Sequence, residues 1–303
     1  MSTIVNRREF LLRSSSIAIG GALLSSTAIG RTTVAASGLR KGVCIGTLPK
    51  EITVLEKFEM AKRAGFEGVQ PNTLNGADEV KECKEAAEKT GLEITSIMNA
   101  DHWKYPLSDN DPEVVKKCVE GIKTSMHNAH DLSAGAVLLV PGIVMADVRY
   151  AEVYSRSQEQ IRKLLPMAKE LKVIIAIENV GNRFLLSPLE MARYVDEFKS
   201  PWVKSFFDIG NVVSTGYPQD WIRSLGKRIC RVHIKRFEPG TDHPKFDPKN
   251  RRNMGIDWPD VRKALNEVGY SGWVTAEVKS GDEDYLKELS ARMDRIFSGQ
   301  NPV

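Results

Sequence analysis

Short apolar runs alternate with segments of helical periodicity along most of the chain, from residue 41 to the C-terminus. The run from Ala136 to Val140 is apolar at every position, which is typical of a parallel strand covered on both faces. A long segment that begins at Pro112 carries its apolar residues at helical spacing. The pattern predicts eight strands, at residues 42–46, 68–71, 93–99, 136–140, 173–177, 203–207, 230–234 and 273–276.

This alternation predicts the α/β class and one domain, a (β/α)8 TIM barrel over residues 37–303. The chain has 303 residues, of which 42% are hydrophobic, and this is enough for one large core. An open doubly wound sheet would usually carry a glycine-rich phosphate turn after its first strand. The segment from Gly46 to Pro49 is not such a turn, so the barrel is preferred.

The first 36 residues have the features of an export signal. Arg7 and Arg8 are followed by Phe10 and a leucine pair, then by a weakly apolar run over 17–29 and small residues at 34–36. This order resembles a twin-arginine signal peptide, which predicts a periplasmic or exported protein. The apolar run is shorter and less apolar than the roughly 20 residues that a membrane span needs. We therefore expect no stable membrane insertion.

The formal net charge of +4 comes mostly from this leader, which holds four arginines against one glutamate. The remaining chain is close to neutral, so we expect no nucleic-acid partner, which would require clustered excess Lys and Arg. The four cysteines lie in apolar strands or on apolar helix faces, and we expect buried free thiols. Cys83 and Cys118 are the one pair whose helices should be neighbours.

Four successive strands in the second half of the chain end in polar residues that commonly bind metals: Glu178, Asp208, His233 and Glu277. In a barrel the C-terminal ends of the strands meet at one rim. Carboxylates crowded there repel one another unless a cation neutralises them. Oxygen ligands with one imidazole suit Mn²⁺, Mg²⁺ or Co²⁺, and Zn²⁺ remains open. No cysteine is close to these strand ends, which argues against a structural zinc site.

The segments around these four residues resemble the sugar isomerase/epimerase superfamily with xylose isomerase-like barrels. Within it, they are most similar to ribulose-phosphate and ketose 3-epimerases and to inosose isomerases. The segments that carry the resemblance are 177–179, 207–211, 232–235 and 275–278, with flanking runs at 184–190 and 255–259. The resemblance implies that Glu178, Asp208, His233 and Glu277 bind one divalent metal ion, with Mn²⁺ the first expectation. It also implies that Glu178 and Glu277 are catalytic and exchange protons with the substrate.

The chemistry follows from these residue types. Removal of a proton from the carbon next to a carbonyl leaves an enediolate, whose negative charge a metal stabilises as a Lewis acid. One carboxylate removes the proton and a second carboxylate on the opposite face returns one. Return to the same carbon gives an epimer and return to the neighbouring carbon gives an isomer. The sequence leaves both outcomes open.

Five further residues are candidates for substrate binding. His102 and Trp103 follow the third strand at the same rim, where a Trp beside a polar group suits stacking on a sugar ring. Asn211 stands where the free-sugar 3-epimerases commonly have His, and Arg236 where many relatives have Asp. Lys235 points the same way as His233 on its strand and is a candidate for stabilising an oxyanion. A salt bridge from Lys235 to one of the carboxylates is the alternative.

The expected function is therefore a metal-dependent isomerase or epimerase of a sugar or cyclitol. The alternatives are a metal-dependent lyase or hydrolase acting on an oxidised keto sugar, and an exported carbohydrate-binding barrel without activity. An endonuclease of this fold would need more metal-binding histidines than the five present, and a basic groove. The expected partner is a small carbohydrate, and export favours an unphosphorylated one. The sequence leaves homo-oligomer formation open.

Overall fold

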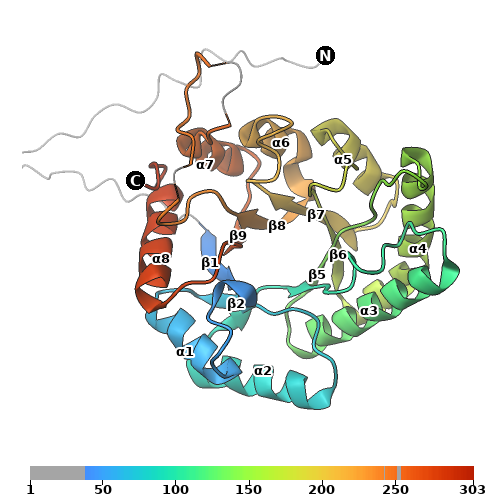
Figure 1. The fold of residues 1–303 in the computed structure, drawn as a ribbon, viewed down its shortest axis with the longest axis horizontal. Helices are drawn as coiled ribbons and strands as arrows, with labels where there is room; N and C mark the ends of the chain where they lie inside the picture. Colours follow the sequence, from blue (N-terminus) through green and yellow to red (C-terminus); the bar gives the residue numbers. More distant parts are fainter. Residues whose placement is uncertain (1–37, 242, 251–253) are drawn as a thin grey trace, which may run out of the picture. The chain divides into compact units, whose positions relative to one another are not determined.

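Parallel strands form a ring at the centre of the structure, and the helices surround it (Figure 1). The computed structural model describes residues 38–241, 243–250 and 254–303, so the expected signal peptide over 1–36 lies outside the described residues. Every strand pair is parallel, in the order β3-β2-β1-β9-β8-β7-β6-β5-β4. In the described part of the chain the strands are β1 (Leu39–Cys44), β2 (Gly68–Gln70), β3 (Glu93–Ile94), β4 (Ile97–Met98), β5 (Ala136–Leu139), β6 (Ile174–Glu178), β7 (Val203–Asp208), β8 (Ile229–Ile234) and β9 (Gly272–Ala276).

The expected third strand, at 93–99, is divided into β3 and β4 because it changes its pairing partner. The first part pairs with β2, whereas the second part pairs with β5. The amide of Met98 donates to the carbonyl of Pro71, and a parallel bridge joins Asn72 to Met98, so the ring closes at this point. Taken as one position, β3 and β4 give eight strand positions. The predicted (β/α)8 barrel is confirmed, although β1 begins three residues before the expected start at Gly42.

Eight α-helices in the described residues follow the strand positions and cover the outside of the ring (Figure 1). They are α1 (Val54–Arg63), α2 (Ala77–Thr90), α3 (Pro112–Asp131), α4 (Tyr150–Leu171), α5 (Pro188–Asp196), α6 (Pro218–Leu225), α7 (Trp258–Glu267) and α8 (Glu283–Phe297). Ser187 caps α5, since its hydroxyl accepts from the amide of Glu190. Within the described residues, no helix is both long and apolar enough to span a bilayer.

The barrel has an apolar layer on each side of its strands. The large outer layer lies between strands and helices, and a smaller cluster of Leu138, Ala176 and Phe206 fills part of the inside. Side chains alternate between these layers along a strand. In β7, Phe207 faces outward and stacks on Trp221 of α6, with ring centroids 6.2 Å apart. Phe206 and Asp208 therefore point inward, and Asp208 is the last inward residue before the loop.

Candidate metal centre and active site

The four predicted metal ligands converge at the end of the barrel where the strands finish. Glu178 ends β6, Asp208 ends β7, His233 lies near the end of β8, and Glu277 directly follows β9. One ligand atom from each residue lies within 4.8 Å of the others. Glu178, Asp208 and His233 are buried, whereas the side chain of Glu277 is 34% exposed. Glu277 thus forms the side of the cluster that is open to solvent.

The Nδ1 atom of His233 faces the carboxylates. It lies 3.0 Å from Oε1 of Glu178 and 3.2 Å from Oε2 of Glu277. Oδ2 of Asp208 is 4.0 Å from the same nitrogen. All four donor groups therefore face one small volume between the ends of strands β6 to β9.

The residues present fit a divalent cation. Oδ2 of Asp208 is buried, and its contact in the described part of the structure is the ion pair with Lys235 at 2.9 Å, since no hydrogen bond of regular geometry reaches it. One ammonium group faces three clustered carboxylates, and buried anionic oxygens cost several kcal/mol of stability unless enough positive charge compensates them. Three carboxylates and one imidazole are also a donor set that such ions accept. Glu178, Asp208, His233 and Glu277 would hold the ion.

Lys235 contacts two of these carboxylates. Its Nζ lies 2.9 Å from Oδ2 of Asp208 and 2.8 Å from Oε2 of Glu277, so the rim salt bridge considered from the sequence is present. Gly210 allows this arrangement, because a Cβ at position 210 would overlap Cγ of Lys235 and lie 3.2 Å from its Cδ. The ammonium group supplies positive charge next to the same oxygens that a metal ion would bind.

The two glutamates have opposite pKa shifts. Burial raises the pKa of Glu178 to about 7, and His233 only partly offsets this effect. Burial also opposes ionisation of Glu277, but the charges of His233 and Lys235 outweigh it and hold the pKa of this carboxyl below its usual range. A pair of carboxyls whose environments separate their pKa values is suited to acid and base roles. Burial raises the pKa of Asp208, and Lys235 and His233 work against this rise.

Asn179 and Asn211 fix the backbone and side chain of Asp208. The Asn179 amide group exchanges two hydrogen bonds with the backbone of Asp208, at 2.8 and 2.9 Å. The backbone N–H of Asn211 donates to Oδ1 of Asp208 at 2.7 Å, and its side-chain Nδ2 donates to the carbonyl of Asn179. Asn211, predicted to bind substrate, therefore has its amide nitrogen engaged in this clamp. Its substrate contact stays a prediction.

The other predicted substrate-binding residues lie around the same rim with different exposure. His102 is buried, and its Nδ1 accepts from the amide of Val140 at 3.4 Å. Burial lowers the pKa of His102 to about 4, and the charge of Glu277 opposes this shift. Trp103 is 51% exposed and packs edge-on against His102. Arg236 is half-buried and has a left-handed backbone, with φ of 65°. Their contact with substrate also stays a prediction.

Two buried residues, Gln70 and Cys44, contact His233 from below, and a third, Ser96, contacts Gln70; the sequence-based predictions did not include them. Oε1 of Gln70 lies 2.7 Å from Nε2 of His233. The thiol of Cys44 donates to the same oxygen at 3.0 Å, and Nε2 of Gln70 donates to Ser96 at 2.7 Å. Cys44 and Gln70 are the last residues of β1 and β2. The strands expected from the sequence ended at residues 46 and 71, so neither residue stood at a predicted strand end. Cys83 and Cys118, the pair considered for a disulfide, are buried free thiols.

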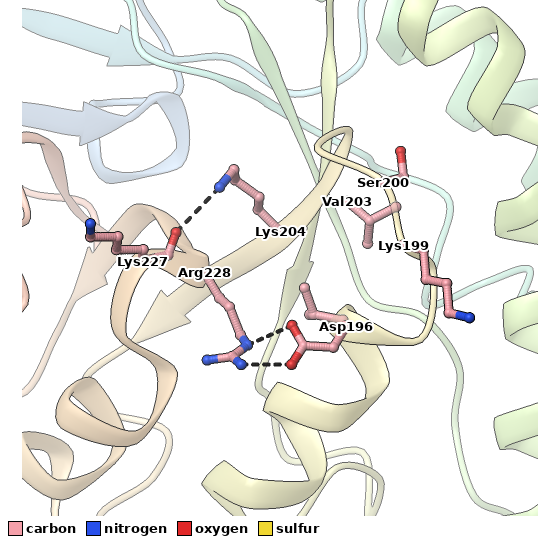
Figure 2. A pocket seen from close by; sticks show the side chains of 8 residues that line it. Asp196, Lys199, Ser200, Val203, Lys204, Lys227 and Arg228 are labelled. Atoms are coloured by element: carbon pink, nitrogen blue, oxygen red, sulfur yellow. Dashed lines mark hydrogen bonds and ion pairs between the residues drawn. The ribbon is translucent and has the colours of Figure 1, made fainter.

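Two cavities in the described residues lie apart from the four ligands. Figure 2 shows one of about 380 Å³ at the start of β7, the barrel end opposite Asp208. Arg228 and Asp196 form a two-point ion pair on its wall, and Lys204 donates to the carbonyl of Lys227. The second, of about 720 Å³, adjoins the loop between β8 and α7 and has Arg236 on its wall. Neither is lined by a residue of the predicted metal centre.

Comparison with known proteins agrees with this geometry. The sequence model of the xylose isomerase-like TIM barrel family matches residues 58–296. The chain belongs to this family. The match spans most of the barrel and includes all four predicted ligands, so the family resemblance seen in the sequence is confirmed.

Several similar proteins carry the names of sugar epimerases. A putative L-ribulose-5-phosphate 3-epimerase of Haemophilus influenzae is 24% identical over 270 residues, covering 83% of this chain and 93% of the relative. The crystal structure of the 3-keto-D-glucoside 4-epimerase of E. coli superposes with a TM-score of 0.71 and 16% identity, covering 86% and 99% of the two chains. The structure of an L-ribulose 3-epimerase superposes with a TM-score of 0.71 and 18% sequence identity, and the match covers 86% of this chain and 95% of the epimerase. At these identities, the two solved structures establish the shared fold alone.

Proposed function

We propose that this barrel is a divalent-metal-dependent epimerase of a sugar that carries a carbonyl group. One observation carries the proposal: Glu178 and Glu277 come from β6 and β9, with Asp208 and His233 between them in strand order, and all four meet within 4.8 Å. Two carboxylates that approach one centre from different strands suit removal of a proton on one face and its return on the other. The named activities of the relatives favour epimerisation over isomerisation.

Glu178, Asp208, His233 and Glu277 are the proposed metal ligands, with Mn²⁺ the first expectation and Mg²⁺, Co²⁺ or Zn²⁺ as alternatives. When bound, the ion supplies Lewis-acid stabilisation of the negative charge that develops on the substrate oxygens. Asn179 and Asn211 keep Asp208 in place through the hydrogen bonds described above. Lys235 provides a further positive charge that an enediolate oxygen can approach.

The proton transfer uses the two glutamates alone. One carboxylate takes the proton from the carbon next to the carbonyl, and the electron pair of the broken C–H bond delocalises onto the carbonyl oxygen. The other glutamate donates a proton to the opposite face of the same carbon, so the carbonyl is restored and the configuration is inverted. Because the reaction is reversible, each glutamate acts as acid in one direction and as base in the other.

The test is exchange of the substrate's α-proton with solvent deuterium, with L-ribulose, D-psicose, D-tagatose and a 3-keto-glucoside as substrates. Glu178→Gln and Glu277→Gln keep an oxygen that can touch the metal but lose the basic site. Each variant should retain measurable Mn²⁺ and lose about 10²–10⁴ of the exchange rate. His233→Gln should instead bind Mn²⁺ more weakly and regain part of its activity at high Mn²⁺.

Two results would overturn the proposal. The first is a purified protein that contains no divalent ion and takes up none of Mn²⁺, Co²⁺ or Zn²⁺. The second is a Glu277→Gln variant that incorporates deuterium at the parent rate. A base other than these glutamates would then act, and a lyase or hydrolase acting on a keto sugar would become the leading hypothesis.

We also propose that the protein is exported through the twin-arginine pathway and meets unphosphorylated sugars. The support is the order of Arg7, Arg8 and Phe10 before the weakly apolar run. Replacing both arginines with lysine should retain the protein in the cytoplasm, as cell fractionation would measure. Unchanged periplasmic yield would contradict this assignment.

A further inference from the structure

The ring nitrogen of His233 that faces away from the carboxylates is held by residues of the opposite side of the barrel. Nε2 lies 2.7 Å from Oε1 of Gln70, and no part of the Gln70 side chain reaches solvent. Two further contacts hold the Gln70 amide: Cys44 donates to its oxygen at 3.0 Å, and its nitrogen donates to Ser96 at 2.7 Å. Gln70 therefore connects three strand positions to one imidazole.

When His233 is neutral, as a metal ligand must be, these contacts determine which of its nitrogens carries the proton. The amide nitrogen of Gln70 is directed at Ser96, so the atom that faces Nε2 is an oxygen, which only accepts. The Cys44 sulfur also lies 3.7 Å from Nε2, but the thiol donates to the nearer Gln70 oxygen at 3.0 Å. Nε2 must then be the donor, and a neutral imidazole protonated at Nε2 has its lone pair at Nδ1. Nδ1 is the atom that faces Glu178 and Glu277, at 3.0 and 3.2 Å.

Packing against Phe206 limits the rotation of the His233 ring. The rings of Phe206 and His233 have centroids 4.4 Å apart at an angle of 61°, and His233 has no solvent-exposed surface. The imidazole is thus confined by Phe206 and anchored at one nitrogen by Gln70. A ligand held this way loses little freedom when it binds a metal ion.

We propose that Gln70 is a positioning residue of the metal centre, which holds His233 in the tautomer and orientation that present Nδ1 to a divalent cation. Cys44 and Ser96 in turn keep the Gln70 amide in the required orientation. The inference rests on the proposed function for the presence of the ion. The inference goes beyond the proposed function because it assigns a role to residues that touch neither the metal ion nor the substrate.

The reverse orientation of the amide makes the opposite prediction. If the amide nitrogen of Gln70 faced Nε2 of His233, the histidine Nε2 would have to accept a hydrogen bond from it. The ring proton of His233 would then lie on Nδ1. Nδ1 would then donate to Glu178 or Glu277 and have no lone pair for a cation. The position of one proton therefore separates the two arrangements.

Metal affinity of the full chain tests the proposal, measured for Mn²⁺ and Zn²⁺ by competition with a chelator. Gln70→Met keeps the length of the side chain and removes the acceptor, and it should weaken binding about 10–100-fold. Gln70→Glu keeps an acceptor for Nε2 and offers its second oxygen to the Ser96 hydroxyl, so it should restore binding. Thr95→Val is the matched control, because the Thr95 hydroxyl is buried in the same barrel interior and has no hydrogen-bond partner in the described residues. This control should bind as the parent does.

The ring proton is measured directly by ¹⁵N NMR of the Zn²⁺-loaded parent protein, with the His233 signals assigned by their loss in His233→Gln. The proton should be on Nε2. A proton on Nδ1, or Gln70→Met binding metal within twofold of the parent, would overturn the proposal. A parent protein that binds no ion would overturn both this inference and the proposed function. A parent that binds the ion but exchanges no substrate proton would overturn only the proposed function.

Discussion

The two sides of the barrel contribute different kinds of groups to the same centre. Strands β6 to β9, the ligand arc, deliver three carboxylates and one imidazole. Strands β1 to β4 and the link between β3 and β4, the support arc, place the neutral groups of Cys44, Gln70 and Ser96 beside this centre. The two rim histidines show the same contrast. Burial lowers the pKa of His102, which follows the support arc, to about 4. Burial also acts to lower the pKa of His233, but the contacts of this ring with Cys44, Glu277 and Glu178 outweigh it and raise the pKa above its usual value.

This division has an electrostatic reason. A fourth or fifth carboxylate from the support arc would increase the repulsion that the ligand arc already contains. Neutral amide, thiol and hydroxyl groups instead provide directed hydrogen bonds without added charge. One arc therefore provides charge and the other provides geometry.

The largest effect should come from removing the positive charge inside the ligand arc. Lys235→Met leaves Asp208 and Glu277 without the ammonium that lies within 2.9 Å of both. Breaking a buried pair on one side typically costs about 3–5 kcal/mol, and the metal-free variant at pH 8 should lose stability of this order. Mn²⁺ should restore more stability to the variant than to the parent, because the ion replaces the missing charge. Urea unfolding with and without Mn²⁺ measures both quantities.

Lys279→Met is the control for Lys235→Met. Lys279 lies two residues after Glu277 on the same rim, is exposed, and makes no ion pair with the described residues. Its loss should change the free energy of unfolding by less than about 0.5 kcal/mol. Equal effects of the two substitutions would show that Lys235 does not compensate the carboxylates.

A smaller effect should separate the two histidines by pH. His102 is buried as the neutral form, with a pKa of about 4 against 6.5 for an unperturbed histidine. Protonation therefore favours the unfolded chain, so the stability contributed by neutral His102 is complete above pH 6.5 and is lost as the pH falls toward 4. The loss should total about 3 kcal/mol. His102→Gln keeps an acceptor for the Val140 amide and does not titrate. The difference between the two unfolding free energies should shrink between pH 7 and pH 4, and a constant difference would refute the assignment.

The sequence predicted the ligand arc and missed the support arc, and the reason is physical. Asp208 and Glu277 stand out because a charged residue at the end of an apolar strand is costly without a partner. Gln70 and Cys44 are at equivalent places in β2 and β1, but a neutral amide or thiol there is ordinary in a folded core. Their role depends on which atoms they face across the barrel. The division of the third strand at Thr95 and Ser96 was hidden for the same reason, since it follows from a change of pairing partner.

The smallest effect should come from adding one methyl group behind Lys235. Gly210 lies in the loop after β7, and a Cβ there would overlap Cγ of Lys235, so Gly210→Ala should displace the ammonium from Asp208 and Glu277. Overpacking of this kind costs about 1–3 kcal/mol, and Mn²⁺ should recover the part that comes from the misplaced charge. Gly181, in the loop after β6, is the matched control, because a Cβ there meets no atom within 4 Å. Gly181→Ala should therefore leave the unfolding free energy nearly unchanged with or without Mn²⁺. If both variants lost the same free energy of unfolding, these loops would be sensitive to any substitution. The space that Gly210 leaves for the Lys235 side chain would then not be what places the ammonium group next to Asp208 and Glu277.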